Sequence, residues 1–277
     1  MIELERYLQR LRLDAPPVDG AGVLHLKQLH RAHVASIPFE NLDPRRGVPV
    51  RLSPEALQDK LVDGGRGGYC FEHNLLFAHA LRASPGVVSV EPLLARVRWG
   101  RPRAAPKPLT HLLLKVTTAD ERIWHADVGF GNGTLLEPIP FGPGGPYEQC
   151  GWRFRTVAEG DELVLQTDGD DGWSDVYAFS PRPVQPIDIE LGNWYTSTHP
   201  DSAFVKGLIV TRHDADGVRT TLSDLRGHPT LRVARPGAAP VETDVDADAV
   251  AELLVDEFGL PRLAGLPISG PRPAAAG

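Results

Sequence analysis

The sequence predicts an α+β fold, with helices in the first third of the chain and β-strands in the middle third. Apolar residues near the start recur at Leu4, Leu8 and Leu11, which is the spacing of one face of a helix. From Val87 onward the apolar positions alternate instead, as is typical of strands, and after Pro186 the two patterns are mixed. At 277 residues the chain exceeds the size of most single-core domains, so we expect two or three subdomains.

The first third contains four predicted helices, at residues 4–11, 23–37, 53–63 and 70–81. Their ends carry local signals. Ile37 precedes Pro38, and a residue before proline disfavours the α region. Ser53 and Pro54 are of the types preferred at the N-cap and at the first helical position.

The middle third contains predicted strands at residues 95–99, 111–116, 122–128, 152–157, 162–166 and 173–179. We expect them to form an antiparallel sheet or barrel. Further on, predicted strands at 204–212 and 218–225 flank a turn, and a helix at 249–258 ends before Gly259. The Pro- and Ala-rich segment 267–277 is expected to be loose.

Composition and charge argue against several classes of protein. The net charge of −7 and the pI near 5.8 leave no basic excess to neutralise the phosphates of a nucleic acid. No apolar run approaches the roughly 20 residues of a membrane span, and the start lacks a signal-peptide pattern. Cys70 and Cys150 make no disulfide framework, so we expect a soluble, cytoplasmic protein. One basic patch fits either a phosphorylated coenzyme or a solvated loop: Arg96, Arg98, Arg101, Arg103 and Lys107.

A run of glycines leads directly into Cys70, the first residue of a predicted helix, in the stretch GGRGGYCFEHN at residues 64–74. Glycines let the backbone turn sharply and approach a ligand closely. A cysteine at the positive end of a helix can have a pKa well below the usual value of about 8.5, and with a base nearby it is a nucleophile. A buried structural cysteine is the alternative interpretation of this stretch alone.

A base and an orienting carboxylate are predicted from the two strands at 111–116 and 122–128. If a three-residue loop at 118–120 joins them, His111 and Asp127 lie directly opposite each other, with Cβ atoms about 4.5–5.5 Å apart. A two-residue loop would place them on opposite faces of the sheet. In the first case Asp127 fixes the tautomer of His111, and the other ring nitrogen activates Cys70. Two ordinary sheet residues are the alternative.

Other chemistries have less support. His73 and His79 follow Cys70 on one predicted helix, but no second cluster of matching spacing accompanies them, so we expect no metal. Residues 129–133, with the sequence GFGNG, lack the spacing and the following helix of a dinucleotide-binding motif. We interpret them as a flexible loop beside Asp127 that a substrate can approach. Cys150 has no helix, base or glycine run around it and is interpreted as structural.

Four stretches carry a resemblance to a known family. The segment RGGYCFEHN at residues 66–74 resembles the active-site motif of the arylamine N-acetyltransferases, bacterial type. IPFENL at 37–42, Thr110 with His111, and DVGFG at 127–131 resemble the other landmarks of that family, in the same order. NWY at 193–195, through to SAF at 202–204, adds a further match. The resemblance spans roughly residues 1 to 260 and favours the interpretation of Cys70 as a nucleophile.

The resemblance implies a three-part, cysteine-protease-like architecture. Residues 1–86 would form a helical bundle that carries Cys70, residues 87–190 an antiparallel β-barrel that carries His111 and Asp127, and residues 191–277 an α/β lid with a loose tail. It also implies a ping-pong reaction with a thioester intermediate, of the kind used in xenobiotic metabolism. Cys70, as a thiolate beside protonated His111, would take the acetyl group of acetyl-CoA and pass it to an arylamine, an arylhydrazine or an arylhydroxylamine.

By the same resemblance, Phe39, Thr110, Phe130 and Phe204 fall where the family lines its acceptor and coenzyme cleft. Their aromatic rings suit stacking with a flat amine, although Phe39 and Phe204 also fit a hydrophobic core. Propionyl-CoA and malonyl-CoA are alternative donors. A macrolactam-forming amide synthase of ansamycin pathways and a non-catalytic ligand-binding module are alternative functions on the same fold. The sequence leaves the oligomeric state open.

Overall fold

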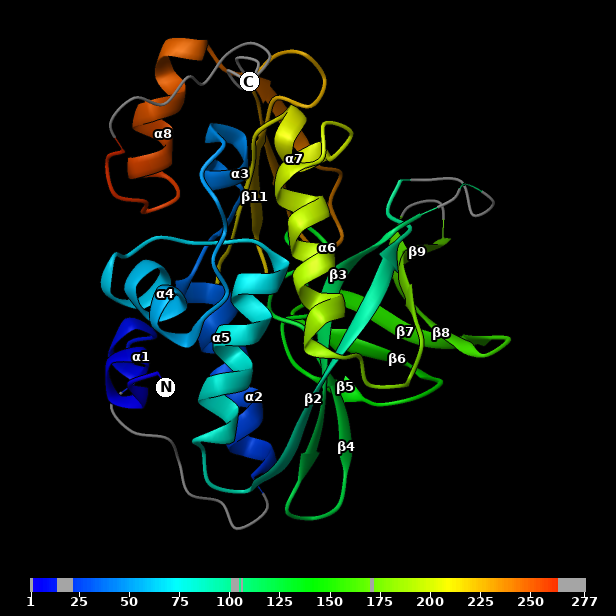
Figure 1. Ribbon diagram of the computed structural model, residues 1–277. Coiled ribbons are helices and arrows are strands. Elements are labelled where there is room, and N and C mark those ends of the chain that lie inside the picture. The colour runs from blue at the N-terminus through cyan, green and yellow to red at the C-terminus, as the bar shows by residue number, and fades with distance from the viewer. Residues whose placement is uncertain (1, 14–21, 101–104, 106, 170–171, 264–277) are drawn as a thin grey trace.

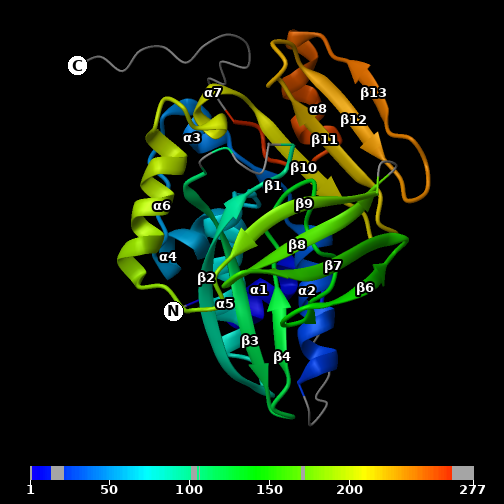
Figure 2. The same ribbon diagram turned by 90° about the vertical axis from the view of Figure 1, so that its right-hand side faces the viewer.

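The computed structural model describes residues 2–13, 22–100, 105, 107–169 and 172–263. Helices from the first third pack against one side of a curved β-sheet, and a second sheet with its own helix lies at one end (Figures 1 and 2). The fold is therefore α+β, as predicted. No helix in the described part of the chain is long and apolar enough to cross a bilayer. The segment 267–277, predicted to be loose, lies outside the described residues, as do Arg101 and Arg103.

The helical part consists of α1 (Leu4–Arg10), α2 (Val23–Ser36), α3 (Leu42–Arg46), α4 (Pro54–Leu57), a π-helical segment (Gln58–Asp63) and α5 (Cys70–Arg82). The predicted helix at 53–63 thus changes its hydrogen-bonding pattern halfway along. Its start is as predicted, because the Ser53 hydroxyl accepts a hydrogen bond from the Ala56 N–H at 3.3 Å.

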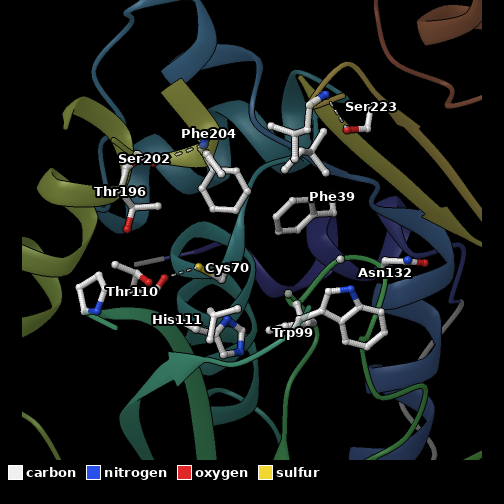
Figure 3. A pocket seen from close by; sticks show the side chains of 18 of the residues that line it. Phe39, Cys70, Trp99, Thr110, His111, Asn132, Thr196, Ser202, Phe204 and Ser223 are labelled. Atoms are coloured by element: carbon white, nitrogen blue, oxygen red, sulfur yellow. Dashed lines mark hydrogen bonds between the residues drawn. The ribbon is translucent and has the colours of Figure 1, made fainter. Parts of the chain in front are cut away.

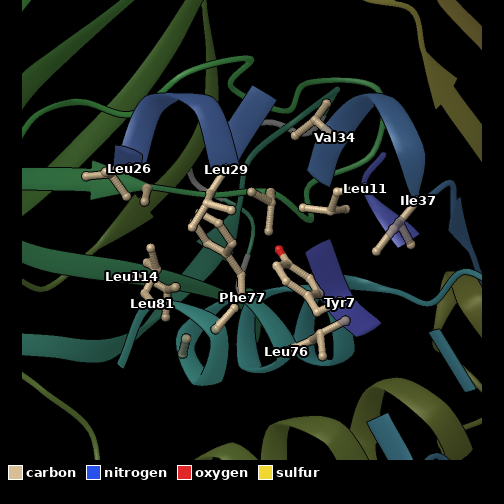
Figure 4. Close-up of a cluster of buried hydrophobic side chains, with 14 of the residues drawn as sticks. Tyr7, Leu11, Leu26, Leu29, Val34, Ile37, Leu76, Phe77, Leu81 and Leu114 are labelled. Carbon is tan, nitrogen blue, oxygen red and sulfur yellow. The ribbon is translucent and has the colours of Figure 1, made fainter. Parts of the chain in front are cut away.

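The core of the helical part brings together apolar faces of α1, α2 and α5 (Figure 4). Tyr7, Leu29 and Phe77 are fully buried there. Leu114 and Val116 of the neighbouring sheet complete the same cluster, so one face of that sheet packs on the helices. This contact places the start of α5 beside the sheet.

The central sheet is antiparallel throughout and has the strand order β5-β4-β3-β2-β9-β8-β7-β6. Its strands are β2 (Val87–Val97), β3 (Leu109–Thr118), β4 (Ile123–Ala126), β5 (Ile139–Pro140), β6 (Gly144–Gln149), β7 (Trp152–Glu159), β8 (Glu162–Gly169) and β9 (Gly172–Phe179). The sheet curls into a barrel whose interior is filled by buried apolar side chains such as Leu113, Tyr177 and Phe179 (Figure 2). The short strands β5 and β6 were not predicted from the sequence.

The hairpin between β3 and β4 corrects one prediction. The loop consists of residues 119–121 rather than 118–120, because Thr118 pairs with Arg122 through an N–H···O bond of 3.0 Å. The third loop residue, Glu121, has a φ of 64°, the left-handed conformation that closes a three-residue hairpin. Glycine or asparagine would have signalled that position, and glutamate gives no such signal.

The shifted loop moves every cross-strand pair. Lys115 faces His125, and Leu114 faces Ala126 in the last pair of the ladder. The prediction that His111 lies directly opposite Asp127 is therefore wrong, and His111 is diagonal to it. The displacement is by an even number of positions, so the two side chains stay on the same face of the sheet, the one that lines the barrel.

The last part of the chain builds a five-stranded antiparallel sheet in the order β1-β10-β11-β12-β13. Its strands are β1 (Phe39–Glu40), β10 (Ile209–His213), β11 (Arg219–Ser223), β12 (Thr230–Ala234) and β13 (Val241–Asp244). Helices α6 (Pro186–Thr198), α7 (Ala203–Lys206) and α8 (Val250–Asp256) accompany it, with a 3-10 turn at Ala247–Ala249. Strand β1 comes from the first third of the chain. The domain boundaries predicted at residues 86 and 190 remain a prediction.

Candidate active site

The glycines before Cys70 allow the backbone to pack against two neighbouring segments. A Cβ on Gly67 would lie 2.0 Å from the Pro38 carbonyl oxygen, and a Cβ on Gly68 would lie 2.7 Å from Glu72 Oε2. Glu72 also caps the helix, since its Oε2 accepts the Tyr69 N–H at 3.0 Å. The position and direction of Cys70 at the start of α5 thus depend on these residues being glycine.

A network of ion pairs fixes the same loop. Lys60 Nζ lies 2.7 Å from Glu72 Oε1 and 2.6 Å from Asp43 Oδ2. Arg66 Nη2 lies 3.0 Å from Asp43 Oδ1 and 2.6 Å from Glu40 Oε1. Three carboxylates thereby share two cations in a largely buried setting, so each charge beneath the loop has a partner of opposite sign.

His111 and Asp127 form a hydrogen-bonded pair. His111 Nε2 lies 2.7 Å from Asp127 Oδ2, and both side chains are buried. Asp127 Oδ1 accepts hydrogen bonds from Asn74 Nδ2 at 2.9 Å and from the Gly129 N–H at 3.0 Å. Burial alone would raise the pKa of Asp127, but the charge and hydrogen bond of His111 outweigh it and hold that pKa well below its usual range. Asp127 is a carboxylate, and His111 Nδ1 is the ring nitrogen left to exchange a proton.

Cys70 is almost fully buried, and its Sγ lies 3.5 Å from the Thr110 carbonyl oxygen. The sequence predicted a lowered thiol pKa from the helix N-terminus, and the structure corrects this. Burial raises the pKa of Cys70 to about 12, although backbone groups at Leu112 and Phe71 favour the anion. Desolvation of a lone charge thus outweighs the helix end. The thiol can ionise readily only if its proton goes to a base within the same site.

Cys70 and His111 open onto a cavity of about 410 Å³ (Figure 3). All four residues predicted to line a substrate cleft also line this cavity: Phe39, Thr110, Phe130 and Phe204. Asp127 lies behind His111, outside the wall. The Phe130 ring meets His111 edge-on with centroids 5.0 Å apart, and the Phe39 and Phe204 rings lie 5.8 Å apart. The cavity therefore combines a thiol, an imidazole and flat apolar surfaces.

Asn74, Trp99 and Tyr177 also belong to this site and were not predicted from the sequence. Asn74 lies one helical turn after Cys70, and that spacing could have identified it. Trp99 lines the cavity beside Phe130, with ring centroids 6.0 Å apart. Tyr177 donates a hydrogen bond to Asp127 Oδ2 at 2.8 Å. It belongs to a strand some fifty residues further along, and no local pattern marks it.

Gly129, Gly131 and Asn132 of the loop at residues 129–133 all line the cavity. Gly129 also packs closely on α5, since a Cβ there would lie 2.9 Å from His73 Cβ and 3.0 Å from Cys70 Cα. The first glycine of the loop thus serves close packing beside the thiol.

The remaining candidates have structural partners. His73 is hydrogen-bonded to His33 Nε2 at 2.8 Å and to the Pro38 carbonyl at 3.2 Å. Cys150 Sγ, in the β6–β7 turn, contacts Arg31 Nη2 at 3.1 Å and does not line the cavity. Among the described residues, no group of three or more His, Cys, Asp or Glu side chains has metal-ligand geometry.

The basic patch is engaged within the protein where the structure describes it. Arg98 pairs with Glu159 at 2.8 Å and with Asp175 at 3.2 Å. Arg96 donates to the Lys107 carbonyl. Lys107 alone among these lines the cavity.

A thiol and an imidazole that line one cavity, with a buried carboxylate hydrogen-bonded behind the imidazole, are the components of cysteine-based group transfer. A family model described as N-acetyltransferase matches residues 23–264. The chain is 42% identical over 264 residues to an arylamine N-acetyltransferase of Mycolicibacterium smegmatis, covering 94% of this chain and 92% of the relative. It is 36% identical over 255 residues to the arylamine N-acetyltransferase / N-hydroxyarylamine O-acetyltransferase of Salmonella typhimurium, covering 90% and 86%.

The solved structure of Mycobacterium marinum arylamine N-acetyltransferase in complex with CoA matches with a TM-score of 0.85 and 38% sequence identity. The match covers 93% of each chain. The present chain belongs to the arylamine N-acetyltransferase family.

Proposed function

We propose that the protein transfers an acetyl group from acetyl-CoA to the nitrogen of arylamines or arylhydrazines, and to arylhydroxylamines, with Cys70 as the acetyl carrier. The observation that carries the proposal is the shared cavity: Cys70 and His111 both open onto it, and Asp127 is hydrogen-bonded to the far side of the His111 ring. Aromatic residues around the thiol supply surfaces that fit a flat amine.

The first half-reaction begins with transfer of the Cys70 proton to His111 Nδ1. Ionising the thiol alone is unfavourable, since burial raises its pKa to about 12. Moving the proton to His111 adds no net charge to the site, and the Asp127 carboxylate at 2.7 Å stabilises the resulting imidazolium. The thiolate attacks the thioester carbonyl of acetyl-CoA. The C–S bond to CoA then breaks, and CoA leaves as a thiol with the proton from His111.

The second half-reaction transfers the acetyl group from Cys70 to the amine. The amine nitrogen attacks the acetyl carbonyl on Cys70 and gives up a proton to His111. The C–S bond to Cys70 breaks, and His111 returns the proton to the sulfur, so the site regains its starting state. The CoA complex of the M. marinum relative supports the donor, and the name of the S. typhimurium relative supports hydroxylamines among the acceptors.

The proposal is tested with Cys70→Ala, and Cys150→Ala serves as the matched control because Cys150 lies away from the cavity. Intact-mass measurement after incubation with acetyl-CoA should show one added acetyl group in the wild type and in Cys150→Ala, and none in Cys70→Ala. A panel of anilines and hydrazines, with acetyl-, propionyl- and malonyl-CoA, then defines donor and acceptor. Turnover that persists in folded Cys70→Ala would refute the mechanism, and failure to acetylate any simple amine would refute the assigned reaction.

A further inference from the structure

A line of hydrogen-bonded side chains continues behind Asp127, away from the cavity. Asp127 Oδ2 accepts from the Tyr177 hydroxyl at 2.8 Å, and the same hydroxyl lies 2.8 Å from His125 Nε2. His125 is on β4, two positions before Asp127, so both side chains point to the inside of the barrel. All three side chains are fully buried or nearly so. His125 thus lies two hydrogen bonds behind the carboxylate of the proposed catalytic pair.

The protons in this line can be assigned from its chemistry. Asp127 is ionised, because its pKa is held well below the usual range, so it can only accept hydrogen bonds. The single proton of the Tyr177 hydroxyl must therefore point to Asp127. The hydroxyl oxygen is then the acceptor for His125, whose Nε2 must carry a hydrogen. This fixes the neutral Nε2–H tautomer of His125.

The other ring nitrogen of His125, Nδ1, is buried and has no hydrogen-bond partner among the residues that the structure describes. The ring packs edge-on against Phe179, with centroids 5.0 Å apart, in the apolar interior of the barrel. The charged and titratable groups that act on it are Asp127, His111 and His30. An apolar side chain would fill this place without an unpaired nitrogen, so the hydrogen bond to Tyr177 is the feature that accounts for histidine here.

We propose that His125 is a positioning residue for the acetyl-transfer reaction, and that it acts on Asp127 through the Tyr177 hydroxyl. The inference rests on the proposed function, in which Asp127 orients His111. By donating to the Tyr177 oxygen, His125 leaves Asp127 as the only acceptor for the hydroxyl proton. The carboxylate is thereby held in line with His111 Nε2, and the imidazolium that forms during the reaction is stabilised in one orientation.

The variants His125→Phe and His125→Gln separate this role from packing. Phenylalanine fills the space without a donor, whereas the glutamine amide can still donate to Tyr177. In His125→Phe we expect kcat/KM to fall about three- to tenfold, mostly through kcat, as for loss of one buried hydrogen bond. The pH midpoint for alkylation of Cys70 by iodoacetamide should rise by about half a unit, because a loosened Asp127 stabilises the imidazolium less. His125→Gln should restore both values.

A double-mutant cycle with Tyr177→Phe tests whether His125 acts through the Tyr177 hydroxyl. Once the hydroxyl is removed, adding His125→Phe should cause no further loss. Nitrogen-15 spectra of wild-type histidines test the tautomer without any variant, and a His125 ring protonated at Nδ1 would overturn the assignment. The inference also fails if the alkylation profile of His125→Phe superimposes on that of the wild type, or if His125→Gln is equally impaired. Alkylation needs no acetyl donor, so absence of acetyl transfer would contradict only the proposed function.

Discussion

Gly129 lies so close to Cys70 that a Cβ atom at position 129 would be 3.0 Å from the Cα of the cysteine. The same atom would lie 2.9 Å from His73 Cβ. Neither neighbour is the flexible end of a side chain, so a larger residue would have to move α5 away from the loop that follows Asp127. The contact sets the distance between the element that carries the thiol and the element that carries the carboxylate.

We therefore expect Gly129→Ala to reduce activity more than stability. Overpacking should cost about 1–3 kcal/mol in the free energy of unfolding, while displacement of the thiol should lower kcat at least tenfold. Urea denaturation and acetylation of an aniline measure the two effects. Gly169→Ala is the control, since the nearest atom to its Cβ lies at 3.9 Å. Equal activity in the two variants would show that the contact does not position Cys70.

The buried histidines should make the fold sensitive to acid. Burial lowers the pKa of His30, His73 and His125 to about 4, and that of His213 to about 3. An unfolded histidine has a pKa of about 6.5, so below that pH the unfolded chain binds more protons than the folded one. The free energy of unfolding therefore decreases as the pH is lowered. Each such histidine contributes a slope of about 1.4 kcal/mol per pH unit between roughly pH 6.5 and 4.

Urea denaturation between about pH 7.5 and 5 measures this slope, and His213→Gln should make it shallower by about one histidine's share. His213 is a suitable choice because it lies on β10 and donates to the Gly131 carbonyl, apart from the His111–Asp127 pair. A free energy of unfolding that stays constant down to pH 5 would contradict the expectation.

Removal of His111 should raise the pH at which the buried Cys70 thiol is alkylated. If His111 accepts the Cys70 proton as proposed, alkylation of the wild type by iodoacetamide should persist below about pH 6, as for a thiolate–imidazolium pair. In His111→Gln the thiol must ionise alone, and burial raises its pKa to about 12, so labelling should require strongly alkaline pH. Coincident pH profiles for the two proteins would show that His111 is not the proton acceptor.

The aromatic wall of the cavity should determine affinity for the amine. Phe204 contacts Phe39 and Tyr69, with ring centroids 5.8 Å and 5.7 Å away. We expect Phe204→Leu to raise KM for an aniline about two- to tenfold with a smaller change in kcat, as for loss of one aromatic contact. Phe141→Leu is the matched control, because Phe141 packs on Phe179 in the barrel and does not line the cavity. If both variants raise KM alike, the wall is not the binding surface.

The sequence predicted the start of α5 at Cys70 and, for a three-residue loop, the placement of His111 and Asp127 on one face of a hairpin. Those features follow from local patterns, namely a glycine run, a helical period and strand alternation. The exact register did not follow, because Glu121 adopts the left-handed conformation without being glycine or asparagine. Tyr177 was also out of reach, since β9 joins the site through the order of strands in the barrel.

Helix α6 was also not predicted from the sequence, but for a different reason. Its exposed side carries the large apolar residues Ile187, Leu191 and Trp194, while its buried side carries Ile189 together with the small residues Gly192 and Thr196. A Cβ on Gly192 would lie 2.9 Å from the Phe71 ring, so close packing selects a small residue there. Apolar residues thus occur on both faces, and periodicity cannot identify such a helix.

Strand β1 joins the five-stranded sheet to the loop before Cys70 through backbone pairing. Phe39 pairs with Thr211 on one side and forms a bridge with Gly68 on the other, and the Glu40 N–H donates to the Gly68 carbonyl at 2.7 Å. Moving the five-stranded sheet away from the helices would therefore break backbone pairing next to the glycine loop that precedes Cys70. A chain truncated before β10 would leave β1 with an unpaired edge directly beside that loop.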